Sequence, residues 1–147
     1  MIPYLDAGYL LTLLVKTSSS PVANEWMRRT DPPFALNALH QLQVETLLLQ
    51  LQKSQNSGER ARGAEASRFW RNYLEEGVFQ ITTPDLELAF NAAISWTTYF
   101  SQAPPPPLLI LHPALAAVSG ADHFFSFDPR SRAIARAAGM ELIPLDL

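Results

Sequence analysis

Two aspartates, Asp6 and Asp128, each end a short apolar run of the kind that forms a buried strand. In an open α/β sheet the carboxyl ends of parallel strands meet at one rim, where ligands bind. Paired carboxylates at such a rim suit Mg²⁺ or Mn²⁺, because these ions prefer oxygen ligands and bridge to phosphates. Ser126, two residues before Asp128 on the same strand face, adds a hydroxyl to this candidate site.

The simpler interpretation of Asp6 is a helix cap. An aspartate directly before a helix accepts a backbone N–H there, and Asp6 stands at such a boundary. The expected convergence of two strand ends at one rim favours a shared site over separate caps.

The elements that must position these residues alternate between strand and helix along the chain. Strands are expected at residues 1–6, 34–36, 78–82, 123–128 and 142–145. Helices are expected after residue 8 and at residues 20–31, 38–55, 59–76, 83–101, 108–118 and 129–138, with a polyproline spacer at 104–107. This alternation predicts an α/β fold in which helices cover both faces of a mostly parallel sheet.

The composition bounds the classes of protein that this chain can represent. A length of 147 residues with 48% hydrophobic residues predicts a single domain, residues 1–147. The absence of cysteine excludes disulfides and thiolate metal sites within the chain. Since no apolar run is long enough to cross a membrane and no leader pattern is present, a soluble cytoplasmic protein is expected. The net charge of −3 disfavours a general nucleic-acid coat protein, although nine of the eleven basic residues are arginines.

Four segments carry a resemblance that extends over nearly the whole chain. They are residues 4–10, 39–45, 111–122 and 125–128, with the motifs Tyr-Leu-Asp-Ala-Gly-Tyr-Leu, Leu-His-Gln-Leu-Gln-Val-Glu, Leu-His through Gly-Ala-Asp, and Phe-Ser-Phe-Asp. As a set, these segments resemble the PIN-domain ribonucleases, and especially the VapC-type toxins of bacterial toxin–antitoxin pairs. The resemblance implies a three-layer α/β/α domain, PIN-like and Rossmann-like, with a mostly parallel central sheet of four to five strands.

The resemblance also implies a chemistry and partners. Members of the family use about four acidic residues to hold one or two Mg²⁺ or Mn²⁺ ions, which activate water for attack on an RNA phosphodiester. VapC-type toxins form homodimers and are held by an antitoxin protein. RNA, an antitoxin-like protein and a second copy of the chain are therefore the implied partners.

Residue by residue, the family's acidic site is only partly present. Asp6 matches the first acid, Asp128 the last, and Ser126 the hydroxyl position beside it. Gln43 stands at the position of the acid on the long helix, and Leu109 at the position of the third acid. Because two acidic positions are vacated, we expect the remaining carboxylates to bind a divalent ion weakly.

Glu45 is the nearest substitute for the acid missing at Gln43. At about 100° per residue, the two side chains lie roughly 160° apart around a helix. The same helical wheel places Gln43 inward, beside Leu39, Leu42 and Leu49, and Glu45 on the polar face. A register shift of one turn would reverse this assignment. No carboxylate adjoins Leu109, and a turn or cap role is expected for the more distant Asp122.

Other candidate groups have simpler interpretations. We expect a hydrogen-bonded core or cap role for His112 and find no convergent partner for His40 or His123. An aromatic set on the helix at 59–76 fits either RNA stacking or a packed core face: Phe69, Trp70 and Tyr73. The arginines of that helix are candidates for a phosphate-facing patch: Arg60, Arg62, Arg68 and Arg71.

Three hypotheses follow from the sequence. The first is a PIN-like domain with reduced or lost nuclease activity that binds RNA or a partner protein. The second is an active Mg²⁺- or Mn²⁺-dependent endoribonuclease toxin in which another acid, such as Glu45, replaces Gln43. The third is a non-catalytic protein-interaction module.

Overall fold

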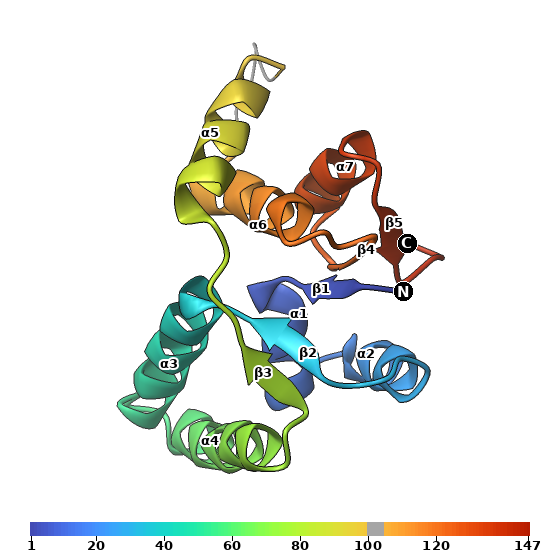
Figure 1. The fold of residues 1–147 in the computed structure, drawn as a ribbon. Coiled ribbons are helices and arrows are strands. Elements are labelled where there is room, and N and C mark those ends of the chain that lie inside the picture. Colours follow the sequence, from blue (N-terminus) through green and yellow to red (C-terminus); the bar gives the residue numbers. More distant parts are fainter. Residues whose placement is uncertain (100–104) are drawn as a thin grey trace. The chain divides into compact units, whose positions relative to one another are not determined.

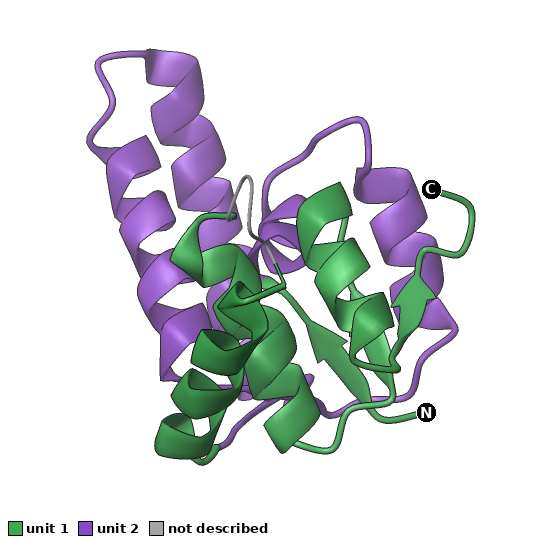
Figure 2. Ribbon diagram, turned by 90° about the horizontal axis from the view of Figure 1, so that it is seen from above, with its two compact units in different colours: residues 1–6, 83–147 green, residues 7–82 purple. Residues whose placement is uncertain are grey.

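The computed structural model describes residues 1–99 and 105–147 of the chain. Two compact units divide these residues (Figure 2): unit 1 contains residues 1–6 and 83–147, and unit 2 contains residues 7–82. Each unit combines a small parallel sheet with helices, so the α/β class predicted from the sequence is confirmed. None of the described helices has the length and apolarity needed to cross a membrane.

Unit 1 contains a three-stranded parallel sheet in the order β1-β4-β5 (Figure 1). Its strands are β1 (Pro3–Leu5), β4 (His123–Phe125) and β5 (Glu141–Ile143). Its helices are α5 (Leu86–Thr97), α6 (Pro107–Val118) and α7 (Pro129–Ala137). The register sets Leu5 beside Phe125, and Phe125 beside Ile143. All three side chains are buried, as expected of a parallel sheet covered by helices.

Unit 2 consists of four helices and a two-stranded parallel sheet. The helices are α1 (Ala7–Leu14), α2 (Ser20–Arg28), α3 (Ala38–Gln52) and α4 (Ser57–Glu75), and the strands are β2 (Phe34–Leu36) and β3 (Phe79–Ile81). Asn37 caps α3 and Asn56 caps α4 through their side-chain oxygens. Gly77 follows α4 with a φ of +71°, which confirms it as the glycine that ends this helix.

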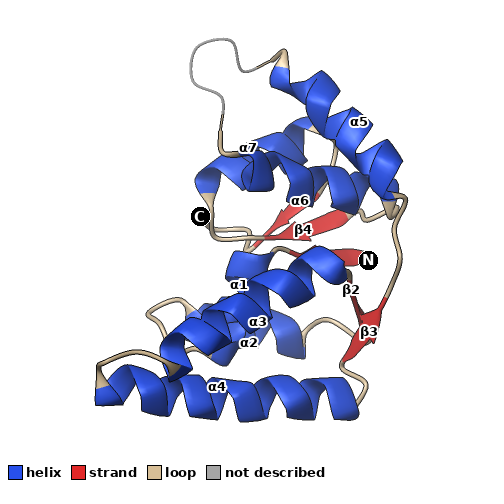
Figure 3. Ribbon diagram, turned by 90° about the vertical axis from the view of Figure 1, so that its left-hand side faces the viewer, coloured by secondary structure: helices blue, strands red, loops and turns tan. Residues whose placement is uncertain are grey.

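Helices α3 and α4 pack side by side in unit 2 (Figure 3). Gly63 makes this close approach possible, since a Cβ atom there would stand 2.8 Å from the Cβ of Leu51. The helices also share a polar link, because the Trp70 indole Nε1–H donates to Oε1 of Glu45 at 2.8 Å. Trp70 is 2% exposed, so it serves the core of unit 2 and not a stacking surface.

The prediction of one sheet of four to five strands needs correction. Five strands form, but they pair into two sheets of three and two strands. Each strand has only three residues. So short a sequence indicates that the strand is buried, but it does not specify which neighbouring strand it pairs with. The three-layer arrangement stays a prediction, as does the single domain.

Two further expectations concern the ends of elements. The strand predicted at 123–128 ends at Phe125, because the chain turns at Ser126, whose Oγ accepts the Asp128 N–H at 3.0 Å. The predicted end of a helix at residue 101 and the start of the polyproline spacer at residue 104 lie outside the described residues.

Candidate functional site

Asp6 directly follows β1, at the carboxyl end of the three-stranded sheet. Its N–H donates to the carbonyl oxygen of Phe125 at 3.0 Å and so extends the pairing of β1 with β4 by one residue. The residue is 6% exposed. A buried carboxylate in this position needs a compensating charge or hydrogen bonds, because desolvation of an isolated charge is costly.

Asp128 does not end a strand but caps α7. Its Oδ1 accepts the N–H groups of Arg130 and Ser131 at 2.8 Å and 3.2 Å, and its Oδ2 lies 3.2 Å from Nη2 of Arg130. Partial burial raises the pKa of Asp128, but the hydrogen bonds from Arg130 and Ser131 outweigh this effect and lower the pKa overall. Asp128 therefore has the helix-capping role that the sequence analysis considered for Asp6.

Ser126 is fully buried and connects β4, β5 and the start of α7. Its N–H donates to the carbonyl oxygen of Ile143 at 3.1 Å, and its hydroxyl oxygen accepts the N–H of Asp128. The hydroxyl thus shapes the turn that places Asp128 at the N-terminus of α7.

Arg132 is the residue of this region that sequence reasoning missed. Its guanidinium donates from Nη1 to the carbonyl oxygen of Ser126 at 2.9 Å and from Nη2 to that of Pro144 at 2.7 Å. The side chain is only 6% exposed, and its charge interacts favourably with Asp6. Burial, followed by the nearby charge of Arg136, lowers the pKa of Arg132, whereas Asp6 opposes this shift. A cation of the chain itself therefore lies where the three parallel strands end.

The helical position of Arg132 was the available signal. It comes four residues after the capping Asp128 and three before the buried Ala135, which places it on the inner side of α7. An arginine on such a face is buried only when its donors find acceptors, and the free carbonyls beyond two strand ends supply them.

Leu109 lies close to Asp128 through a shared neighbour. Its carbonyl oxygen accepts the hydroxyl of Ser131 at 3.1 Å, and the N–H of Ser131 donates to Asp128. The fold thus brings the start of α6 to the start of α7, as the predicted site requires. The half-buried leucine side chain supplies no oxygen ligand there.

Gln43 belongs to unit 2, where it lies half-buried on α3. The buried stripe of this helix consists of His40, Val44 and Leu48. Leu42 and Leu49, predicted to share the inward side with Gln43, are 65% and 50% exposed. That prediction was wrong. Helices α1 and α4 pack against α3 and cover only one side of it, and Leu42 and Leu49 do not lie on that side.

The oxygen donors described above do not fit a divalent ion well. Asp128 is engaged with two backbone N–H groups and Arg130, and the charge of Asp6 interacts favourably with the buried guanidinium of Arg132. Among residues 1–99 and 105–147, no cluster of three or more His, Asp or Glu side chains is arranged to hold a metal ion. A hard divalent cation needs several converging oxygens.

The histidines have structural partners. Nδ1 of His112 lies 2.9 Å from the Tyr4 hydroxyl, which confirms its core role, and His40 completes the N-terminal capping box of α3. The expectation that His123 has no convergent partner was wrong. Its ring nitrogens lie 2.6 Å from Asp122 and 3.1 Å from Glu141, at the amino ends of β4 and β5, which the separate sequence segments did not reveal.

The arginines predicted to form a phosphate-facing patch are exposed on α4. At about 100° per residue, Arg60, Arg68 and Arg71 lie within about 80° of one another, whereas Arg62 points to the opposite side. None of these side chains forms an ion pair with a described residue, and the guanidinium of Arg60 binds the carbonyls of Ser54 and Gln55 at the end of α3.

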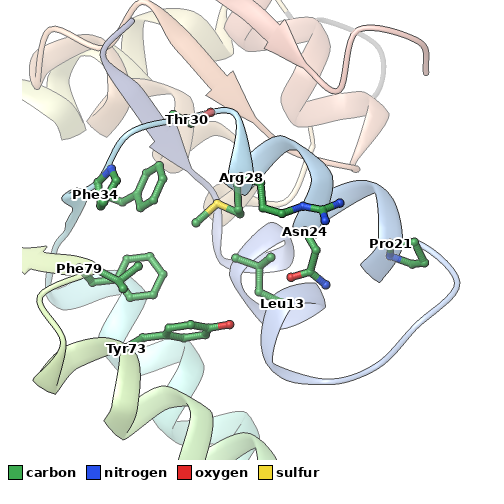
Figure 4. Close-up of a pocket in the computed structure, with 11 residues that line it drawn as sticks. Leu13, Pro21, Asn24, Arg28, Thr30, Phe34, Tyr73 and Phe79 are labelled. Carbon is green, nitrogen blue, oxygen red and sulfur yellow. The ribbon is translucent and has the colours of Figure 1, made fainter.

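A cavity of about 530 Å³ lies in unit 2 (Figure 4). The aromatic rings of Phe34, Tyr73 and Phe79 form one side, opposite Leu13 and Asn24. The remaining lining residues are Pro21, Met27, Arg28, Thr30, Pro32 and Val78. None of the residues predicted for the acidic site lines this cavity, so it is separate from that chemistry.

No family model matches the sequence, and no curated protein matches it significantly. At the rim, the fold brings together Asp6, Ser126, Asp128, Arg132 and the backbone of Leu109.

Proposed function

We propose that this chain is a PIN-like domain whose acidic site has lost most or all metal-dependent nuclease activity, and that it acts by binding RNA or a partner protein. The observation that carries the proposal is the buried guanidinium of Arg132, whose charge interacts favourably with Asp6 at the rim where the family holds its metal ions. A site that supplies its own cation has less charge left to attract Mg²⁺ or Mn²⁺.

The vacated acidic positions support the same conclusion. Leu109 approaches Asp128 through its backbone but brings an apolar side chain, and Gln43 brings no charge. Glu45 accepts a hydrogen bond from the buried Trp70, which gives its carboxylate a structural role within unit 2.

The exposed arginine face of α4 supports RNA binding. Arg60, Arg68 and Arg71 present guanidinium groups without carboxylate partners among the described residues. Guanidinium groups pair with phosphate oxygens in a fork geometry, and affinity gained this way falls steeply with salt.

A cleavage assay with Mg²⁺ or Mn²⁺ on single-stranded and structured RNA tests the loss of activity. We expect no metal-dependent cleavage by the natural protein and a gain of cleavage in the double variant Gln43→Glu, Leu109→Asp. A melting curve with and without Mn²⁺ provides a second readout, and we expect a metal-dependent rise of Tm only in the double variant. Metal-dependent cleavage by the natural protein that Asp6→Asn abolishes would instead establish an active ribonuclease.

An RNA-binding titration at several salt concentrations tests the retained function. We expect affinity to fall with salt and to drop at least tenfold in Arg68→Gln, Arg71→Gln. The matched control is Arg28→Gln, which removes an exposed arginine that is paired with Glu25 on α2. Absence of salt-dependent binding would exclude RNA and leave the partner protein as the ligand class.

A further inference from the structure

We propose that the cavity of unit 2 binds a small planar aromatic molecule that carries a carboxylate group. The proposal goes beyond the function argued above and does not depend on it. All of the residues that line the cavity belong to unit 2, so its shape is set within one compact unit. Its volume of about 530 Å³ lies within the range of about 300–1,000 Å³ that is usual for small-molecule sites.

Three aromatic side chains form one wall of this cavity (Figure 4): Phe34, Tyr73 and Phe79. Phe34 and Phe79 are register partners on β2 and β3 and are 2% and 5% exposed, so the sheet holds their rings in place. The Tyr73 ring stands at 89° to that of Phe79, with 5.7 Å between the centroids, and the Phe34 ring is tilted by 52° to it. Because the rings are inclined, a planar ligand can stack on one of them and meet the edge of another, which are the favoured aromatic contacts.

Two neutral hydrogen-bond donors accompany the aromatic wall. Figure 4 shows the hydroxyl of Tyr73 directed toward Leu13 and Asn24, on the opposite side of the cavity. The Asn24 amide donates one hydrogen from Nδ2 to the carbonyl oxygen of Ser20 at 2.9 Å and keeps a second hydrogen for another acceptor. A carboxylate on the ligand can accept from both groups while its ring lies against the wall.

Arg28 sets the sign of the charge that the cavity favours. It is the only ionised side chain among the described residues that line the cavity. Its guanidinium shares the carboxylate of Glu25 with Arg29, whose Nη2 lies 2.8 Å from Oε1, so these three side chains keep one positive charge uncompensated. An anion is therefore favoured over a cation. A doubly charged phosphate would need more donors than one arginine that already pairs with Glu25 can provide.

Equilibrium binding of three probes to the full chain in low-salt buffer tests the ligand class. The probe 1-naphthylacetate has the aromatic ring and the carboxylate, 1-naphthylmethylamine replaces the anion by a cation, and cyclohexylacetate keeps the carboxylate without an aromatic ring. We expect millimolar or tighter binding of 1-naphthylacetate, and affinities at least about threefold weaker for the other two. Chemical-shift titration of the ¹⁵N-labelled protein should place the changes at residues 24–34 and 73–79. Equal binding of all three probes, no binding of 1-naphthylacetate, or changes centred elsewhere would overturn the proposal.

Occupying the cavity with a side chain is the second test. Asn24→Trp should weaken the binding of 1-naphthylacetate at least about tenfold, because the indole takes up the space of the ligand. Asn72→Trp is the matched control, since Asn72 is exposed on α4 and does not line the cavity. Tyr73→Phe keeps the ring, removes one donor and should weaken binding about threefold to tenfold. Circular dichroism ensures that the variants are folded, and affinities that stay equal to that of the natural protein in both Asn24→Trp and Tyr73→Phe would contradict this site.

The charge preference is the third test. Arg28→Gln should remove the preference for 1-naphthylacetate over 1-naphthylmethylamine, because the positive charge at the cavity is lost. Arg71→Gln removes an exposed arginine of α4 that does not line the cavity and should leave the preference unchanged. A preference that survives Arg28→Gln, or that disappears equally in both variants, would overturn the assignment of an anionic ligand.

Discussion

The guanidinium of Arg132 donates a 2.9 Å hydrogen bond to the carbonyl oxygen of Ser126. A second bond, of 2.7 Å, reaches the carbonyl oxygen of Pro144, so one side chain ties together the segments that follow β4 and β5. Asp6, which follows β1, contributes the opposing charge. The carboxyl ends of all three strands of unit 1 are thus organised around a buried cation.

Arg132→Met should lower the free energy of unfolding by about 3–5 kcal/mol, because it leaves the carbonyls of Ser126 and Pro144 without their donor and removes the charge that interacts favourably with the buried Asp6. Arg132→Lys should cost less, since it keeps the charge but cannot reproduce both hydrogen bonds. Urea unfolding at pH 7 measures both effects. Arg136→Met, at an exposed position of the same helix, is the control. Equal losses for Arg132→Met and Arg136→Met would show that the buried guanidinium contributes nothing.

Asp128 should stabilise the fold in a pH-dependent way. Its pKa is lowered in the folded protein, so its contribution is present above the unfolded pKa, near 4, and is lost as the pH falls through the folded value. Asp128→Ala should cost about 1 kcal/mol at pH 7 through loss of the cap. Asp128→Asn retains a capping oxygen. The difference in free energy of unfolding between this variant and the natural protein should shrink as the pH falls toward 3. Urea unfolding at pH 7 and pH 3 checks this, and a difference that grows on acidification would contradict it.

Glu45 should matter for the stability of unit 2 through Trp70. Glu45→Ala should cost about 1 kcal/mol, because the buried indole N–H loses its acceptor. Glu45→Gln retains a side-chain oxygen and should stay within about 0.5 kcal/mol of the natural protein. Chemical denaturation followed by circular dichroism distinguishes the two variants. Equal stability of both variants would remove the structural role assigned to this carboxylate.

Gly63→Ala should destabilise the protein although alanine is the better helix former. At a solvent-exposed position inside a helix, replacing glycine by alanine raises the free energy of unfolding by about 1 kcal/mol. Here the added Cβ would stand 2.8 Å from the Cβ of Leu51 and 3.0 Å from the backbone nitrogen of Gln52. Overpacking of this kind costs about 1–3 kcal/mol, so we expect a net loss in thermal or urea unfolding. A rise in Tm would show that α3 and α4 move apart without cost.

Much of the secondary structure could be predicted from the sequence. The five strands and seven helices of the described residues lie where hydrophobic periodicity, capping residues and turn residues indicate them. Gly77 and the apolar strand at Phe124 are local signals of this kind. Such signals are reliable because each segment must bury its own apolar face whichever partner covers it.

The partners of these elements could not be predicted in the same way. The division of five strands into two sheets depends on which strand edges meet, and three-residue strands do not encode that choice. The same limit applies to α3, where packing by neighbouring helices buried Val44 and left Leu42 exposed. The pairing of His123 with Asp122 and Glu141 likewise joins separate parts of the chain.

The candidate site shows the same division between local and tertiary information. The sequence alone identified Asp6, Ser126 and Asp128, and showed that Gln43 and Leu109 bring no carboxylate to the positions they occupy. Only the tertiary structure decided that Asp128 caps a helix and that Arg132 lies buried at the rim. Residue types state which groups a chain can offer. The charged groups that find a counter-charge inside the protein are decided by which distant segments meet in three dimensions. A buried charge is retained only where the fold supplies that counter-charge and hydrogen-bond partners.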